Sequence, residues 1–267
     1  MKLKTFVQLT AAFLLLLITD SSIAGATSKR APAKQFYELV IYHLKDQAQE
    51  ERIDKYLAEA FVPAMHRYGI KTVGVFKTAN IDTAADKKIY VLLTYRSLTE
   101  FHQINSKLNT DQELAAAGKD FTDAAFDQPA YTRKESVLME SFSGMPSLRK
   151  PQFSNDRKER IYELRSYESA TDKLYRNKLS MFNDGNEMAI FDRIGSQAVF
   201  YGAVLAGSHM PNLMYMTTYT DMKSREEHWK AFGNDPDWKK LSAMPEYQHN
   251  VSRNVIEFLV PTGYSDF

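Results

Sequence analysis

The chain has 267 residues, of which 44% are hydrophobic and 25% are charged, a composition typical of soluble globular proteins. Lysine and arginine number 34 and aspartate and glutamate 33, so the chain lacks the excess of basic residues that binding to nucleic acid or an anionic membrane would need. The absence of cysteine excludes a disulfide framework, a lipid-modified cysteine and thiol catalysis.

The first 26 residues have the pattern of a secretory signal peptide. Lys2 and Lys4 precede an apolar run over residues 6–18, and small side chains follow up to Ala26. The run is shorter than the ~20 residues that a membrane-spanning helix needs. We therefore expect residues 1–26 to be removed, which leaves a periplasmic or secreted protein without a stable membrane anchor.

The next segment, residues 34–142, predicts the order strand, helix, strand, strand, helix, strand. Its expected strands are rich in β-branched and aromatic residues and cover 36–42, 72–76, 89–95 and 137–142. Apolar residues at helical spacing over 53–68 predict a helix that Pro63 kinks. A second helical region begins near Leu98, and Thr110 is expected to cap its continuation.

The chain then repeats this plan. Tyr37-Glu38-Leu39 returns 125 residues later as Tyr162-Glu163-Leu164, after a linker at 143–159 that contains glycine, proline and charges. The expected strands of this second copy, which covers 160–262, are 161–167, 198–205, 213–219 and 255–260. Its helices are expected at 171–194, with a disturbance near Asp184, then from a cap at Ser224, and again after Asp235.

Two βαββαβ units of this kind predict two ferredoxin-like domains. The expected strands are apolar on both faces: the run Leu213-Met214-Tyr215-Met216 shows almost no alternation. A sheet with one face in solvent would alternate, so the second face of each sheet is expected to be covered by the other sheet. The predicted fold is therefore α+β, with two tandem ferredoxin-like domains packed sheet to sheet as a dimeric α+β barrel.

Several segments of the second copy resemble the NIPSNAP family. They are 162–167, 190–195, 212–216, 225–232 and 235–238; weaker matches in the first copy are 37–39, 63–70 and 73–76. The resemblance implies the dimeric α+β barrel fold. It implies no particular reaction, because the family has no agreed activity. Relatives that share only the barrel include haem-binding enzymes and cofactor-free monooxygenases.

Aromatic and basic residues of the second copy form the candidate ligand site. Arg225, His228 and Trp229 would share one face of the expected helix. The candidate ligand-binding residues are Arg165, Tyr167, Tyr201, Tyr215, Tyr219, Arg225 and Trp229. In this hypothesis an arginine binds an anionic group and Trp229 stacks on a flat ligand. The alternative is that the same side chains are packing residues of the core, with their hydroxyl groups satisfied.

The remaining motifs narrow the possible functions. No two of the six histidines have metal-ligand spacing, and no phosphate-binding loop, nucleophile elbow or dinucleotide motif is present, so we expect neither a metal nor a cofactor. The favoured function is binding of a small apolar or aromatic molecule in the second-copy barrel. The alternatives are a cofactor-free oxygenase or isomerase with His228 as general base, or a non-catalytic protein-interaction module. A homo-oligomer is expected in each case.

Overall fold

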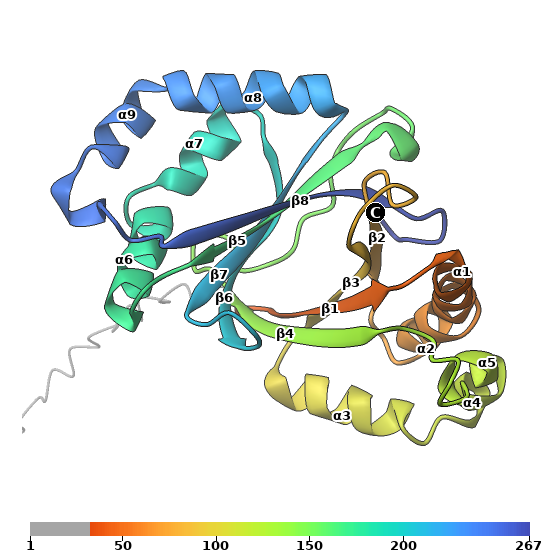
Figure 1. The fold of residues 1–267 in the computed structure, drawn as a ribbon. Coiled ribbons are helices and arrows are strands. Elements are labelled where there is room, and N and C mark those ends of the chain that lie inside the picture. Colours follow the sequence, from red (N-terminus) through yellow and green to blue (C-terminus); the bar gives the residue numbers. More distant parts are fainter. Residues whose placement is uncertain (1–32) are drawn as a thin grey trace, which may run out of the picture. The chain divides into compact units, whose positions relative to one another are not determined.

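The computed structural model describes residues 33–267, and the expected signal peptide at 1–26 lies outside them. The first copy forms four strands, β1 (Phe36–Leu44), β2 (Gly74–Thr78), β3 (Lys87–Tyr95) and β4 (Arg133–Ser141). Its helices are α1 (Gln47–Tyr56), the π-helix η1 (Leu57–Phe61), α2 (Val62–Arg67), α3 (Leu98–Leu108), α4 (Gln112–Ala117) and α5 (Lys119–Thr122). Figure 1 shows these helices beside the strands of their own half.

The second copy repeats the arrangement. Its strands are β5 (Ile161–Glu168), β6 (Gln197–Ala206), β7 (Asn212–Tyr219) and β8 (Arg253–Pro261). Its helices are α6 (Asp172–Asn183), α7 (Glu187–Arg193), α8 (Met222–Asn234) and α9 (Pro236–Ser242), with short 3₁₀ turns η2 (Arg157–Glu159) and η3 (Pro245–Tyr247). None of the helices in the part of the chain that the structure describes has the length and apolarity to cross a membrane.

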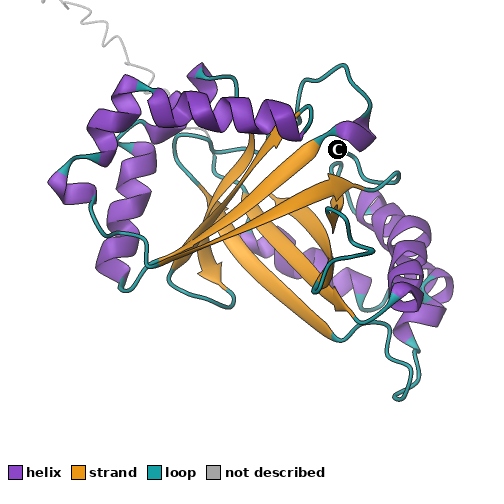
Figure 2. Ribbon diagram, turned by 45° about the horizontal axis from the view of Figure 1, so that its top comes forward, coloured by secondary structure: helices purple, strands orange, loops and turns teal. Residues whose placement is uncertain are grey.

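The strands of both copies close into one antiparallel barrel in the order β1-β3-β2-β8-β5-β7-β6-β4 (Figure 2). The first strand of each copy is central: β1 lies between β3 and β4, and β5 lies between β7 and β8. The two half-sheets join along β2–β8 and β4–β6. The predicted α+β barrel built from two ferredoxin-like units is therefore confirmed.

The strand β7 is buried on both of its faces, and the central strands β1 and β5 are mostly so, which explains the missing alternation in these segments of the sequence. Met214 and Met216 point into the barrel, where side chains of both copies share one core. Their neighbours Leu213 and Tyr215 point outward and pack under the second-copy helices. A separate outer core lies under the helices of the first copy. Burial on both faces favours apolar side chains at successive positions.

Two predicted caps are wrong by one and three residues. Asp111, not Thr110, caps α4, because its carboxylate accepts the Leu114 amide hydrogen. Asp221, not Ser224, caps α8, and its carboxylate accepts the amide hydrogen of Ser224 itself. In both cases the cap residue has extended backbone angles, which aim an aspartate side chain at the free amides of the first turn.

Pro63 does not break the helix that contains it, because the preceding turn is wider. A proline has no N–H and its ring collides with the carbonyl four residues earlier. The π-helix Leu57–Phe61 precedes Pro63, and the Val62 amide donates to the carbonyl of Leu57, five residues back. The expected disturbance near Asp184 is a full interruption between α6 and α7, where Asn186 has a left-handed φ of 60°.

Candidate functional site

A cavity of about 260 Å³ opens at the end of the barrel where β1 and β5 finish. We call it the barrel-end cavity. Its apolar floor is formed by inward-facing side chains, Ile41, Tyr90, Val137, Leu164, Met214 and Val255. Its rim is polar and comprises His43, Asp86, Lys88, Glu135, Ser166, Glu168, Ser208, His209, Asn212, Arg253 and Glu257. Both copies supply rim and floor, so the cavity requires the closed barrel.

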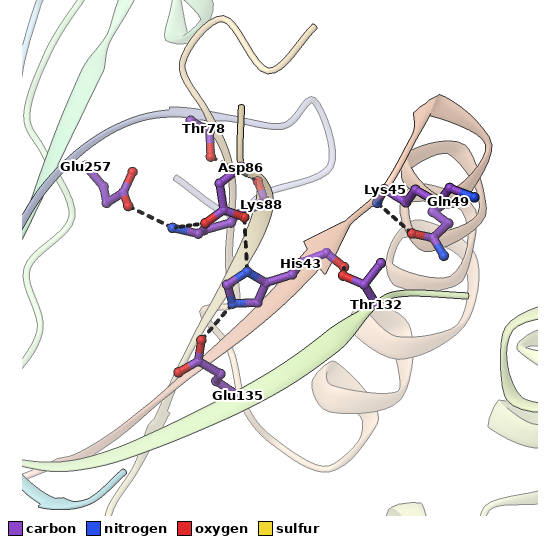
Figure 3. Close-up of polar contacts among 9 residues, drawn as sticks. All are labelled: His43, Lys45, Gln49, Thr78, Asp86, Lys88, Thr132, Glu135 and Glu257. Carbon is purple, nitrogen blue, oxygen red and sulfur yellow. Dashed lines mark hydrogen bonds and ion pairs between the residues drawn. The ribbon is translucent and has the colours of Figure 1, made fainter. Parts of the chain in front are cut away.

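His43 is held between two carboxylates on this rim (Figure 3). Its Nδ1 lies 3.1 Å from Oδ1 of Asp86, which precedes β3, and its Nε2 lies 2.7 Å from Oε1 of Glu135 on β4. Carboxylates accept hydrogen bonds, and only a protonated imidazole can donate from both nitrogens. Through these two contacts His43 clamps β1 to its two neighbouring strands.

Lys88 connects this clamp to the second copy. Its ammonium lies 2.8 Å from Asp86 and 2.9 Å from Glu257 on β8, two strands away from β3 in the barrel (Figure 3). Burial alone would lower the pKa of Lys88, but its hydrogen bonds with both carboxylates raise the pKa overall. The lysine therefore remains charged and links the two halves of the rim.

Acid should release the His43 clamp. Burial would raise the pKa of Asp86 and of Glu135, but hydrogen bonds from Lys88 and His43 to the first, and from Ser208 and His43 to the second, lower both pKa values overall. Groups with a lowered pKa stabilise the fold above their ordinary values of about 4, and this contribution is lost as pH falls through the folded-state pKa.

We therefore expect Glu135→Gln to be less stable than wild type at about pH 5.5, and the difference to vanish below about pH 3. Urea unfolding of both proteins across this pH range measures the effect. A difference that persists unchanged in acid would contradict the charged clamp.

Two side chains that the second copy supplies to the rim, His209 and Arg253, are more exposed to solvent than His43 and Lys88. His209 has a left-handed φ of 64° and its Nδ1 lies 3.6 Å from Oε1 of Glu168 at the end of β5. Arg253 approaches the same carboxylate at 3.5 Å. Asn212 donates to the hydroxyl of Ser166, but its own Oδ1 is buried without a hydrogen-bond donor among the described side chains.

The predicted ligand-binding residues lie elsewhere, on the outer face of the second half-sheet under its helices. The structure brings five of them together in one network. The Tyr215 and Tyr167 hydroxyls are 2.9 Å apart, and Arg165 donates to Tyr167 over 3.0 Å. Arg225 and Trp229 join from α8, because both contact the same carboxylate as Arg165.

That carboxylate belongs to Glu163, which is not among the ligand-binding residues predicted from the sequence. It is fully buried and accepts from Arg165 at 2.7 Å, from Arg225 at 2.8 and 2.9 Å, and from the Trp229 indole at 2.7 Å. Burial would raise the pKa of Glu163, but the two guanidinium groups lower it overall. The alternation Glu163, Arg165, Tyr167 along β5 was the signal that could have revealed it.

Tyr201, Tyr219 and His228 complete the predicted set. The Tyr201 hydroxyl is buried without a partner, and the Tyr219 hydroxyl donates to Thr217 at 3.2 Å. His228 bonds through Nδ1 to the carbonyl of Ser224 in its own helix, at 2.6 Å. None of the predicted residues lines the barrel-end cavity, and a ligand role for them stays a prediction.

Three solved structures are similar to the chain over 85–87% of its length. They are a candidate monooxygenase from Fusobacterium nucleatum (8% identity, 93% of that chain, TM-score 0.56), another from Lactobacillus acidophilus (11%, 94%, 0.53) and an anthrone oxidase-like protein (8%, 93%, 0.52). Such identities show the fold alone, and the fold is that of the dimeric α+β barrel proteins. No curated protein matches the chain. Residues 162–266 match the family model NIPSNAP, in the copy for which the resemblance was expected.

Proposed function

We propose that this protein is a NIPSNAP-type small-molecule-binding protein whose ligand occupies the barrel-end cavity, and that it works in the periplasm or outside the cell. The observation that carries the proposal is the cavity itself, in which a polar rim supplied by both copies surrounds an apolar floor at the open end of the barrel. Small-molecule sites are concave and mostly apolar, with a few polar groups that orient the ligand. The expected signal peptide at residues 1–26 supports the location.

The charges on the rim limit the chemistry of this ligand. Four carboxylates line the cavity: Asp86, Glu135, Glu168 and Glu257. Lys88 and Arg253 supply two fixed positive charges, so the carboxylates outnumber them by two before either histidine is counted. A neutral or singly cationic molecule with N–H or O–H donors fits this balance better than an anion. The apolar floor would hold its hydrocarbon or aromatic part.

The geometry of His43 favours binding over acid–base catalysis. A general base needs an unprotonated nitrogen within reach of the substrate proton. Both ring nitrogens of His43 already contact carboxylates, so neither is available without opening the clamp. The cofactor-free oxygenase or isomerase alternative would have to use His228, which lies outside the cavity on α8.

Native mass spectrometry on protein purified from its native envelope tests this proposal. We expect a bound mass that is lost on denaturation, and the same spectra report whether the chain forms the expected homo-oligomer. Val255 on β8 provides the matched variants, because its side chain lines the cavity. Val255→Phe should fill the cavity and lose the bound mass, whereas Val255→Ala should retain it. A wild-type protein without any bound mass, or equal binding by both variants, would overturn the assignment.

A further inference from the structure

The internal duplication gives Glu163 a counterpart, Glu38, with a very different environment. Each glutamate is the second residue of a Tyr-Glu-Leu run on the central strand of its half-sheet, β1 or β5. Both side chains lie on the outer face of the sheet, under the helices, and both residues are buried, at 7% and 0% exposure. The two positions therefore allow a direct comparison of one carboxylate in two settings.

The three side chains that donate hydrogen bonds to Glu163 are replaced by other residue types around Glu38. The N-caps Ser97 of α3 and Asp221 of α8 are 124 residues apart, which aligns these helices. With this offset, and 125 for the strands, the counterparts of Arg165, Arg225 and Trp229 are Val40, Phe101 and Asn105. The first copy has thus replaced two guanidinium groups and an indole N–H with two apolar side chains and an amide.

Glu38 keeps only neutral donors. The hydroxyl of Tyr95 donates to Oε2 at 3.0 Å, and the hydroxyl of Ser136 donates to Oε1 at 2.7 Å. Tyr95 is the counterpart of Tyr219 in the repeat, so this part of the setting is shared. Within residues 33–267, no lysine, arginine or histidine forms an ion pair with Glu38. A buried carboxylate without a cation is unfavourable, because its desolvation is not compensated.

A cavity of about 90 Å³ lies beside this carboxylate, and we call it the first-copy cavity. Its wall includes the side chains of Val40 and Asn105, two of the three replacements, next to Glu38. The rest of the wall is mainly aromatic, from Tyr42, Tyr56, Phe61, Tyr95, Phe121 and Tyr131. Aromatic ring faces attract cations, most strongly when water is excluded. Lys134 also lines the cavity, at its Tyr42 end, and its ammonium lies 5.8 Å from the centre of that ring; it forms no ion pair with Glu38 among the described residues.

We propose that the first-copy cavity binds a small organic cation, whose ammonium group pairs with Glu38 as the guanidinium groups pair with Glu163. The cavity volume limits the ligand to a compact amine or quaternary ammonium. This site is separate from the barrel-end cavity, since Glu38 lies on the outer face of the sheet and the barrel-end cavity lies inside the barrel. The inference therefore does not depend on the function proposed above.

Titration of the purified protein with tetramethylammonium, followed by NMR, tests this site. We expect saturable shifts of aromatic resonances, and no saturable shifts with the neutral isostere tert-butanol. Glu38→Gln should weaken binding at least about tenfold, since it removes the charge while its amide oxygen still accepts from one of the two hydroxyl groups. The exposed Glu59→Gln is the matched control and should bind as wild type does.

A second variant keeps the test decisive if Glu38→Gln folds poorly. Val40→Arg would reproduce the arrangement of Glu163 and Arg165, two residues apart on one strand, and place a resident cation beside Glu38. We expect this variant to lose tetramethylammonium binding. The absence of saturable binding to the wild-type protein, or undiminished binding by either Glu38→Gln or Val40→Arg, would overturn the proposal.

Discussion

Glu163→Gln is expected to lower the free energy of unfolding by about 3–5 kcal/mol, because it leaves one buried guanidinium group, that of Arg165, and one partly buried group, that of Arg225, without their counter-charge. Glu163 is fully buried and contacts Arg165, Arg225 and Trp229 at once. These contacts tie β5 to α8, so the loss should also loosen the helix from the sheet. For a protein of this size the melting temperature should fall by roughly 10 °C.

Thermal and urea unfolding of the variant beside wild type measure this effect. The matched control is Glu140→Gln, since Glu140 pairs with Lys34 at the surface, where ion pairs contribute about 0–1 kcal/mol. The pKa of Glu163 is lowered in the folded protein, so its stabilisation should be present above about pH 4 and diminish in stronger acid. Equal, small effects for the two variants would contradict the role given to this network.

Lys178→Met should have a comparably large effect through a second buried ion pair. The ammonium of Lys178 on α6 lies 2.8 Å from a carboxylate oxygen of Glu187 on α7, and the two residues are only 4% and 2% exposed. Burial raises the pKa of Glu187 despite the attraction of Lys178. Removal of Lys178 alone leaves that carboxyl group without its partner, which costs about 3–5 kcal/mol when the group stays charged.

The double variant Lys178→Met/Glu187→Leu distinguishes the cost of an unpaired charge from a loss of packing. Replacing both members of a buried pair with apolar side chains is often neutral or stabilising, so most of the lost stability should return. The measurement is urea unfolding of the two single variants and the double variant at one pH near neutrality. A double variant as unstable as the sum of the single variants would show that the pair itself does not account for the effect.

The fold could be predicted from the sequence because the patterns that define it occur in both copies. The return of Tyr37-Glu38-Leu39 as Tyr162-Glu163-Leu164 marks the central strand of each half-sheet, and apolar side chains on both strand faces indicate a covered second face. The residues at which the helices begin were predicted less accurately than the strands. Thr110 and Asp111 are both acceptable cap residues, and the backbone conformation that selects one of them is set by tertiary packing.

The site was only partly accessible from the sequence. The grouping of Arg165, Tyr167, Tyr215, Arg225 and Trp229 was anticipated, but the buried glutamate at its centre was not, and its partners fill the space around it. The barrel-end cavity could not be found in this way. His43, Asp86, Glu135 and Glu257 come from four separate segments, and only the register of the closed barrel brings their side chains to one rim.

The two copies have also diverged chemically under one architecture. The second copy surrounds its buried glutamate with arginine and tryptophan, whose hydrogen bonds join α8 to β5. The first copy keeps the glutamate beside an aromatic cavity. A duplicated fold can retain one half for stability while the other half acquires a binding site, because each half-sheet still completes the same barrel.

The most direct test of the proposed ligand site is a crystal structure of the protein purified from its native envelope. We expect non-protein electron density in the barrel-end cavity, with the apolar part of the ligand on the floor residues and its polar group against the rim. Density on the outer face beside Arg225 and Trp229, with only water in the barrel-end cavity, would contradict the proposal and return the ligand to the site expected from the sequence.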